Sequence, residues 1–352
     1  MKSTKKMNVK ISGTGIYLPE NVYTNEDVIE RIKAELPPGD PKAEKLDPKW
    51  IEQNIGIKER RYADQTRTER PETNVNMATW ALEDALSSSG WKAEELDVII
   101  LSSISSGCSN NFSLIPSIAC QVQHNVGAFQ ASAYDILAAC SGWTYAASQA
   151  ISQISSGMAK KVAVISCETQ ERGLEFNNPV SSVLIGDVAA CTLFEESKEA
   201  NVLNLNIEAN REGDSWDIIT LNNPNIWDDP YDGCEFQPRF RLKGKTVFKE
   251  GTKRMVDLAK KSMEAAGLAK DDIQHFVFHQ ANGAMLLMAG SKLGLSPTQV
   301  PINLDRLANT TSGTIPSVLH EIVSSGRVKK GDKIMFVSFG GGITSGSILM
   351  EY

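Results

Sequence analysis

The sequence predicts an α/β fold built from two units of similar design. Short apolar runs with β-strand composition alternate with amphipathic helical stretches along the whole chain, which is typical of layered α/β proteins rather than of separate all-α and all-β modules. The chain has 352 residues, enough for roughly two units at about 150 residues each. Hydrophobic residues make up 41% and charged residues 22%. This ordinary globular composition excludes disordered, collagen-like and coiled-coil chains.

The first unit, residues 1–198, is expected to contain four strands and three helices. Helices are predicted where apolar residues recur every three to four positions, and strands where short apolar runs end at turn-forming residues. The strands are Val9–Tyr17, Val98–Ser103, Val162–Ser166 and Ala189–Phe194, and the helices are Asn76–Ser89, Ser117–His124 and Gly142–Gly157. The segment Ile32–Lys49 is rich in proline and charge, and it is predicted to be a long irregular loop.

The second unit, residues 199–352, shows the same alternation. Its predicted strands are Val202–Ala209, His275–Phe278, Lys333–Ser338 and Ser347–Met350, and its predicted helices are Lys249–Ala266, Ala281–Leu293 and Ile315–Ser324. A second irregular segment, Asn222–Pro238, is rich in Asn, Asp and Pro. Long loops inside a compact domain are usually functional or mobile.

Charge and cysteine usage narrow the class of protein. With 36 Lys and Arg against 43 Asp and Glu, the net charge is −7, which does not favour nucleic acid as the main partner. No apolar run approaches the ~18 residues that span a bilayer, and no apolar segment follows the basic start, so neither membrane insertion nor secretion is expected. The six cysteines show no zinc-type spacing, which indicates a reducing, cytoplasmic compartment.

Cys140 is the strongest candidate for chemistry. It ends the apolar run Asp135–Cys140 and leads directly into a predicted helix. At a helix N-terminus, the helix dipole and the free N–H groups lower the pKa of a thiol and favour the nucleophilic thiolate. The alternative is a buried structural cysteine, since free cysteine is among the most buried residue types, and that interpretation is kept for the other five.

Three further segments could serve such a nucleophile. His279 lies between an apolar strand and a helix, a position where α/β sheets carry functional groups. His275 and His279 would share one face of that strand, but no third ligand lies nearby, so a metal site is not expected. Asn309 lies in a small polar turn, where it is either a helix cap or a hydrogen-bond donor. The run Phe339–Gly342 is either a plain glycine turn or a backbone that approaches a ligand closely and presents N–H groups as an oxyanion hole.

Taken together and in this order, Cys140, His279, Asn309 and the glycine run resemble the β-ketoacyl-acyl-carrier-protein synthase III family of thiolase-fold condensing enzymes. The similarity runs over nearly the whole chain and includes Ser12–Pro19, Asn54–Arg60, Ala119–Gln121, Ile185–Asp187, His279–Asn282 and Ser338–Gly342. The resemblance implies a five-layered α-β-α-β-α fold of two related halves. Residues 1–198 would carry the cysteine, and residues 199–352 would carry the histidine and the asparagine. It further implies a homodimer without a metal or redox cofactor.

The resemblance also implies the reaction. An acyl group would be loaded on Cys140 and condensed with a malonyl- or β-ketoacyl-type thioester by decarboxylative Claisen chemistry. His279 and Asn309 would donate hydrogen bonds to the extender's thioester carbonyl, the N–H groups of Cys140 and Gly341 would form the oxyanion hole, and Phe339 would exclude water. The pathway would be fatty-acid initiation or, favoured by the departures described next, a specialised route to a ketide, resorcinol or polyene-type product.

The departures from the family concern the substrate. Trp50 is retained where the family grips the adenine end of coenzyme A, but Asn54 replaces the arginine that follows it, and Pro179 and Ala284 replace two others. Fewer cationic partners for phosphate favour an acyl-carrier-protein donor over coenzyme A. Ile115, in a lengthened loop, stands near where a phenylalanine often limits chain length. We therefore expect an altered acyl pocket, suited to a medium or longer chain.

A basic stretch supplies a candidate docking surface for an acidic carrier protein. Between Arg239 and Lys261 there are nine basic residues and two acidic ones, and docking is predicted at Lys249, Lys253 and Arg254. The alternative is an ordinary solvated face.

Other functions of the same fold stay open. The acyl group could pass from Cys140 to an alcohol or amine without forming a carbon–carbon bond, although such transfer has no need of Asn309. A non-catalytic partner subunit would need none of Cys140, His279 and Asn309. Related enzymes that join two acyl chains head to head use a glutamate base near Ile115, but no Asp or Glu lies between residues 98 and 134.

Overall fold

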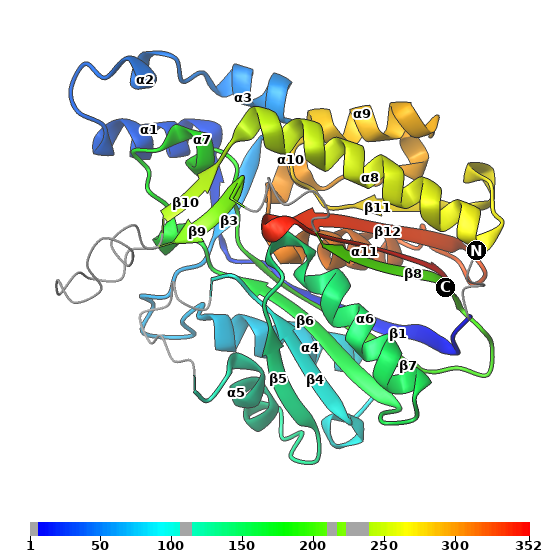
Figure 1. Cartoon of the computed structure of the whole chain (residues 1–352). Coiled ribbons are helices and arrows are strands. Elements are labelled where there is room, and N and C mark those ends of the chain that lie inside the picture. Colours follow the sequence, from blue (N-terminus) through cyan, green and yellow to red (C-terminus); the bar gives the residue numbers. More distant parts are fainter. Residues whose placement is uncertain (1–5, 106–114, 210–216, 223–238) are drawn as a thin grey trace.

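Two β-sheets lie on either side of a central pair of helices in the computed structural model, which describes residues 6–105, 115–209, 217–222 and 239–352 (Figure 1). The first sheet has the order β1 (Val9–Tyr17), β7 (Val188–Glu196), β6 (Lys161–Glu168), β4 (Val98–Ser102) and β5 (Ser132–Ile136). The second has the order β11 (His275–Phe278), β12 (Lys333–Gly340), β13 (Thr344–Glu351) and β8 (Val202–Ala209). All strands of the first sheet precede residue 198, and all strands of the second follow it.

Strand directions repeat between the two sheets. In the first, β1 and β7 are antiparallel, β7 and β6 are antiparallel, and β6 and β4 are parallel. In the second, β8 and β13, β13 and β12, and β12 and β11 follow the same sequence of directions. The two sheets are therefore built on one plan.

Five layers result from the placement of the helices (Figure 1). The central layer holds α6 (Gly142–Ser155) and α11 (Thr314–Ser324), which contact both sheets. The outer layers hold α4 (Asn74–Ser89) and α5 (Ile118–Asn125) on the first sheet, and α8 (Gly244–Ala266) and α9 (Gly283–Leu293) on the second. The predicted five-layered α/β arrangement is confirmed.

Trp143 shows how α6 fits between two sheets. Its ring lies 5.0 Å from that of Phe336 and 6.3 Å from that of Phe194, so it contacts both sheets at once. Neighbouring alanines Ala146, Ala147 and Ala150 are fully buried, because these small side chains let a helix enclosed on both sides pack closely against its neighbours.

The prediction of an irregular loop at Ile32–Lys49 is wrong. The segment contains the end of α1 (Asn25–Glu35), all of α2 (Pro41–Glu44) and the start of α3 (Pro48–Ile55). Pro41 and Pro48 occupy first helical turns, where the missing N–H costs nothing, and the preceding Asp40 and Asp47 accept N–H bonds as N-caps. These prolines start helices instead of breaking them.

Other differences are smaller. Helix α8 begins at Gly244, five residues before the predicted start, and the edge strand β5 was not predicted. Short elements complete the fold: β2 (Asn21–Thr24), β3 (Glu59–Tyr62), α7 (Pro179–Ser182), β9 (Ile219–Asn222), β10 (Arg239–Leu242) and α10 (Leu304–Leu307). Of the predicted irregular segment Asn222–Pro238, residues 223–238 lie outside the described residues. Within the described part of the chain, every helix is too short or too polar to cross a bilayer.

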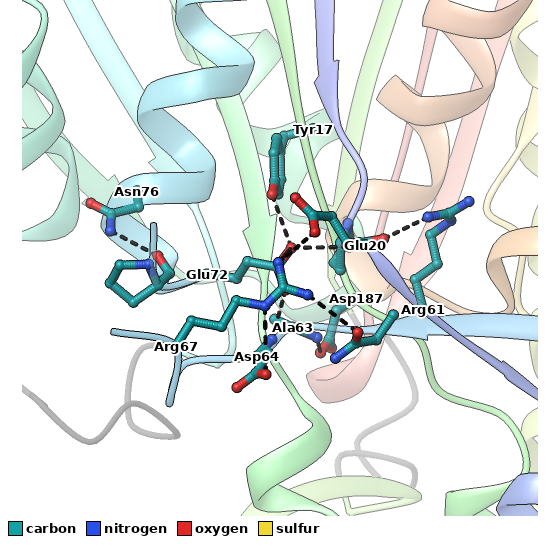
Figure 2. Close-up of polar contacts among 12 residues, drawn as sticks. Tyr17, Glu20, Arg61, Ala63, Asp64, Arg67, Glu72, Asn76 and Asp187 are labelled. Atoms are coloured by element: carbon teal, nitrogen blue, oxygen red, sulfur yellow. Dashed lines mark hydrogen bonds and ion pairs between the residues drawn. The ribbon is translucent and has the colours of Figure 1, made fainter. Parts of the chain in front are cut away.

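A buried carboxylate fixes the connection from β3 to α4 (Figure 2). Glu72 accepts hydrogen bonds from the Tyr17 hydroxyl at 2.9 Å and from the backbone N–H groups of Glu20 and Asp64 at 2.9 and 2.7 Å. One residue before Asp64, the N–H of Ala63 donates to Asp187 at 3.0 Å. The connection is thereby attached both to β1 and to the segment that supports Asn309.

Candidate active site

One cavity of about 730 Å³ brings together residues from both halves of the chain. Cys140 reaches it from the first half, and His279, Asn309 and Phe339 reach it from the second. Trp50 also lines it, at the outer end. Residues separated by nearly 170 positions in the sequence therefore share a single site.

Cys140 lies in a 3₁₀ turn, Ala139–Ser141, directly before α6. The residue before it, Ala139, has φ +48°, a left-handed conformation that is costly for a residue with a Cβ and is common at functional sites. This turn directs the thiol into the cavity while the backbone passes into the helix. Cys140 is 7% exposed, so the thiol is accessible only through the cavity.

The pKa of Cys140 does not follow the expectation from its helix position. Burial, with a smaller contribution from the nearby carboxylate of Glu168, raises the pKa of the thiol to about 12. The predicted lowering of this pKa by the helix dipole is therefore wrong, because desolvation of the thiolate outweighs the dipole. The thiol is protonated near neutral pH, and its proton must leave as the substrate is attacked.

The glycine run at the end of β12 lies against the backbone of Cys140. A Cβ added to Gly340 would lie 2.8 Å from the amide nitrogen of Cys140 and 2.9 Å from that of Ser141. A Cβ on Gly341 would lie 3.0 Å from the carbonyl oxygen of Ile219. Glycine is required here by close backbone approach, so the plain glycine turn is the weaker interpretation.

His279 follows β11 and is almost completely buried, with 1% exposure. Its Nδ1 lies 2.7 Å from the Thr314 hydroxyl, and its ring meets the Phe339 ring edge to face at 5.4 Å. Burial lowers the pKa of His279 to about 3. The imidazole is therefore neutral near pH 7 and carries one N–H.

Asn309 is held through its backbone and its amide oxygen. Its N–H donates to Leu184 at 2.8 Å, and its carbonyl accepts from Gly186 at 3.2 Å. Its Oδ1 accepts from the backbone N–H of Thr311 at 2.9 Å. This bond holds the turn before α11 and leaves the Nδ2 hydrogens as the donating end of the side chain, so the donor role of Asn309 stays a prediction.

The motif Ile185–Asp187 holds the Asn309 loop in place. A Cβ on Gly186 would lie 2.3 Å from the carbonyl oxygen of Leu307, so the two segments approach too closely for any other residue. Asp187 is fully buried and accepts N–H bonds from Ala63 and Gln170. Burial raises its pKa to about 8.

Glu168 is a site residue that the sequence analysis missed. It ends β6, is fully buried, and accepts hydrogen bonds from Ser312 Oγ, from Ser105 Oγ at 2.9 Å and from the N–H of Ile104 at 3.1 Å. Burial raises its pKa above the ordinary glutamate value. An acidic residue two positions after the predicted apolar strand Val162–Ser166 is the signal that could have revealed it.

The outer end of the cavity is apolar and nearly free of cations. Trp50 is 54% exposed there and Val180 is 56% exposed. Asn54 donates its amide to the Trp50 carbonyl at 2.9 Å, within its own helix. Of the described residues that line the cavity, only Lys45 and Asp47 carry a formal charge near neutral pH.

Two other predicted groups do not reach the cavity. Ile115 is 88% exposed and is not among its lining residues, and residues 106–114 before it lie outside the described part of the chain. On α8, Lys249 and Lys253 are exposed. Arg254 is half-buried, and together with Lys253 it lines a small depression that contains acidic side chains, namely Glu208, Glu250 and Asp257.

Comparison with known proteins gives two family models, and each covers a part of the chain that carries site residues. The family model described as 3-oxoacyl-[acyl-carrier-protein] synthase III matches residues 134–211, which include Cys140. The model for the C-terminal part of that synthase matches residues 263–352, which include His279 and Asn309. Two annotated relatives are named β-ketoacyl-[acyl-carrier-protein] synthase III. The one from Clostridium novyi is 34% identical over 98% of this chain and 99% of its own, and the one from Aquifex aeolicus is 33% identical over 98% and 100%.

Solved structures of synthase III enzymes are also similar to this chain. The crystal structure of 3-oxoacyl-[acyl-carrier-protein] synthase III from Aquifex aeolicus superposes with a TM-score of 0.83 at 33% identity, covering 98% of this chain and 100% of that one. The priming β-ketosynthase of the R1128 polyketide pathway superposes with a TM-score of 0.85 at 24% identity, covering 100% and 98%, and shares the fold. The chain belongs to the β-ketoacyl-acyl-carrier-protein synthase III family of thiolase-fold condensing acyltransferases.

Proposed function

We propose that this enzyme takes an acyl group from a carrier protein onto Cys140 and condenses it with a malonyl-type extender. One observation carries the proposal: Cys140, His279 and Asn309 converge in a single buried cavity whose outer end offers almost no cationic partner for the phosphates of coenzyme A. Catalysis requires the convergence of these residues, and the apolar outer end bears on the identity of the donor.

Loading begins with attack of the Cys140 sulfur on the carbonyl carbon of the donor thioester. The new sulfur–carbon bond forms, the bond to the donor sulfur breaks, and the thiol proton passes to the departing sulfur. The oxyanion is stabilised by backbone N–H groups of Cys140 and Gly341, which belong to two segments in close contact. Phe339, 3% exposed, packs against His279 and keeps water from the acyl thioester.

Condensation then uses the second half of the molecule. The bond between the α-carbon and the carboxylate of the extender breaks, carbon dioxide leaves, and the electron pair remains as an enolate. His279 and Asn309 Nδ2 stabilise that negative charge by donating hydrogen bonds to the thioester oxygen. The enolate carbon attacks the acyl carbon, and the Cys140 thiolate departs and takes up a proton.

A carrier-protein donor is favoured by the charges around the cavity. A phosphopantetheine arm is narrow and mainly uncharged, whereas coenzyme A adds an adenosine and two further phosphate groups that need cationic contacts. Lys45 is the one basic residue among the described lining residues. Acyl chains of medium or greater length would suit the apolar lining supplied by Val247, Phe248 and Met285.

Docking of the carrier protein is proposed for one face of α8. Lys245, Lys249, Lys253 and Lys260 are all exposed, and helical spacing places them on the same side. An acidic carrier would meet this row of positive charge next to the cavity that Val247 and Phe248 line. Arg254 contributes less than the exposed lysines because it is half-buried, and Lys253 shares with it the acidic neighbours of one small depression.

A homodimer is proposed through the free edge of the first sheet. In the described part of the chain β5 pairs with β4 alone, and unpaired strand edges readily pair with another chain. Exposed apolar side chains flank this edge, with Phe129 at 67% and Leu137 at 76% exposure. Ile115 would then approach the acyl pocket of the second copy.

The four described cysteines are all free, as expected for the cytoplasm.

Mass spectrometry of the intact protein tests the proposal. Wild type and Cys140→Ala are incubated with acyl-carrier-protein and acyl-coenzyme A donors of graded length. A Cys140-dependent adduct from carrier-protein donors is expected, followed by release of a β-ketoacyl product when a malonyl extender is added. Efficient loading from short acyl-coenzyme A would reject the donor assignment and indicate ordinary fatty-acid initiation. Loading with release to an alcohol or amine alone would reject condensation.

Asn54→Arg tests the outer end directly. The added guanidinium should raise kcat/KM for acyl-coenzyme A by roughly 1.5- to fivefold, the size expected for one exposed charge contact, and leave the carrier-protein reaction unchanged. Asn54→Gln is the matched control without charge. Equal effects of both variants would show that side-chain length, not charge, governs the donor.

A further inference from the structure

Thr314 makes two contacts that compete for one hydrogen. Its hydroxyl lies 2.7 Å from Nδ1 of His279 and 3.0 Å from the carbonyl oxygen of Thr311. A hydroxyl has a single hydrogen to donate. It therefore donates either to the carbonyl or to the imidazole. In the first case it must accept a hydrogen from Nδ1, and in the second it leaves Nδ1 without one.

The direction of this hydrogen bond determines the chemistry of His279 in the cavity. When the hydroxyl donates to Thr311, the neutral imidazole carries its hydrogen on Nδ1, and Nε2 carries a lone pair and no hydrogen. When the hydroxyl donates to Nδ1, the hydrogen is on Nε2. Both side chains are 1% exposed, so water does not substitute readily for either partner.

The proposed reaction needs both forms. In loading, the Cys140 thiol must give up a proton that its buried position holds tightly, and an Nε2 lone pair can accept it before passing it to the departing sulfur. In condensation, the enolate oxygen needs an N–H donor at the same place. Asn309 shows no such ambiguity, because its oxygen is fixed by the N–H of Thr311 and its amide always donates.

We propose that Thr314 is the positioning residue that sets the tautomer of His279, with its hydroxyl turned to Thr311 during loading and to His279 during condensation. The inference rests on the proposed function of His279. No net proton is gained or lost between the two forms, since one hydrogen is lost from Nδ1 and one is gained at Nε2. Burial keeps the imidazole neutral in both forms, because it lowers the pKa of His279 to about 3.

The test combines nitrogen NMR of labelled histidine with rates for each half-reaction. The chain has four histidines, so ¹⁵N-histidine labelling gives few signals, and His279→Ala assigns the relevant one. The unliganded enzyme should show Nδ1–H or both tautomers in exchange. Acylated enzyme that binds a non-decarboxylating malonyl thioester analogue should shift to Nε2–H.

Thr314→Val removes the hydroxyl at nearly equal volume, and Thr314→Ser keeps it. We expect Val to slow condensation at least tenfold, to slow loading as well, and to abolish the tautomer shift, while Ser restores both rates and the shift. A merely structural role would lower stability without changing the tautomer signal.

Two outcomes would overturn the inference. One is an Nδ1–H tautomer in the complex with the extender analogue. The other is wild-type condensation by Thr314→Val while His279→Ala is inactive. If His279→Ala itself condenses normally, the proposed role of His279 fails instead, which separates the two failures.

Discussion

The turns that begin the two central helices are built alike but end in opposite environments. Ala139–Ser141 precedes α6 and Thr311–Gly313 precedes α11, and each is a 3₁₀ turn. Each contains a residue with positive φ, +48° at Ala139 and +46° at Thr311. The next residue is Cys140 in the first turn and Ser312 in the second. By position, Ser312 is the counterpart of the nucleophile.

The strand that meets each turn explains the difference. The end of β12, from the second half, brings Gly340 against the backbone of Cys140. The end of β6, from the first half, brings the carboxylate of Glu168 against Ser312, whose hydroxyl donates to it. A glycine leaves space and free N–H groups for a substrate, whereas a buried carboxylate occupies the hydroxyl. The two halves fold alike but give turns with different roles. The turn Ala139–Ser141, here called the open turn, can react, whereas the turn Thr311–Gly313, here called the closed turn, supports it.

Asn309→Ala, in the second half of the chain, gives the largest expected change in rate. Loss of one donor to a developing oxyanion reduces rate by about 100- to 1,000-fold, and here the loss should fall on condensation. Loading of Cys140 should be nearly unaffected, because the oxyanion of that step is bound elsewhere. Single-turnover assays of each half-reaction check this, with Asn303→Ala as a buried asparagine outside the cavity for comparison. Equal loss of both steps would contradict the division of labour between the halves.

Gly340→Ala should close the open turn. The new Cβ would lie 2.8 Å from the Cys140 nitrogen, so the oxyanion hole must shift, and displacement of about 1 Å can cost about 100-fold in rate. Both half-reactions should slow together. Gly326→Ala is the control, because its Cβ meets open space although its φ is +69°. Normal loading by Gly340→Ala would mean that the turn tolerates a side chain.

Ser312→Ala should weaken the closed turn without changing the chemistry. Glu168 would keep its contacts to Ser105 and Ile104 but lose one buried donor, a change worth about 1–3 kcal/mol of folding stability. Chemical denaturation measures the free energy of unfolding, and acyl loading measured at the same time should stay within a few-fold of wild type. A large loss of loading at unchanged stability would give Ser312 a catalytic role that its position does not indicate.

Glu168→Gln tests how the closed turn acts on the open one. The carboxylate raises the pKa of Cys140, in addition to burial, so removing its charge should lower that pKa. Alkylation of Cys140 by iodoacetamide should then shift toward lower pH. Glu171→Gln, on a partly exposed carboxylate paired with Arg31, controls for general charge. An unchanged alkylation profile would show that burial alone sets the thiol pKa.

Sequence patterns predicted the regular elements well where periodicity was strong. The strands β1, β8 and β11 match their predicted bounds, and the central helices α6 and α11 differ by one or two residues at an end. Prediction of secondary structure failed where one residue type is common in two kinds of structure, as proline is in loops and in first helical turns. Pro41 and Pro48 begin helices, a role that depends on the aspartates before them and on Ile51 and Ile55 finding a core. Strand β5 has no continuous apolar run, because Ser132 and Asp135 interrupt it at the edge of the sheet.

By itself, the sequence determined the alternation of strands and helices, the cysteine at a helix start, and the histidine, asparagine and glycine segments that accompany it. These features are local, and they depend on residue type and spacing. Tertiary structure decided the rest. It set the pKa of Cys140 through burial, placed the hidden Glu168 behind the site, and kept Ile115 outside the cavity of its own chain. Desolvation and contact between distant segments exist only after the two halves have packed together.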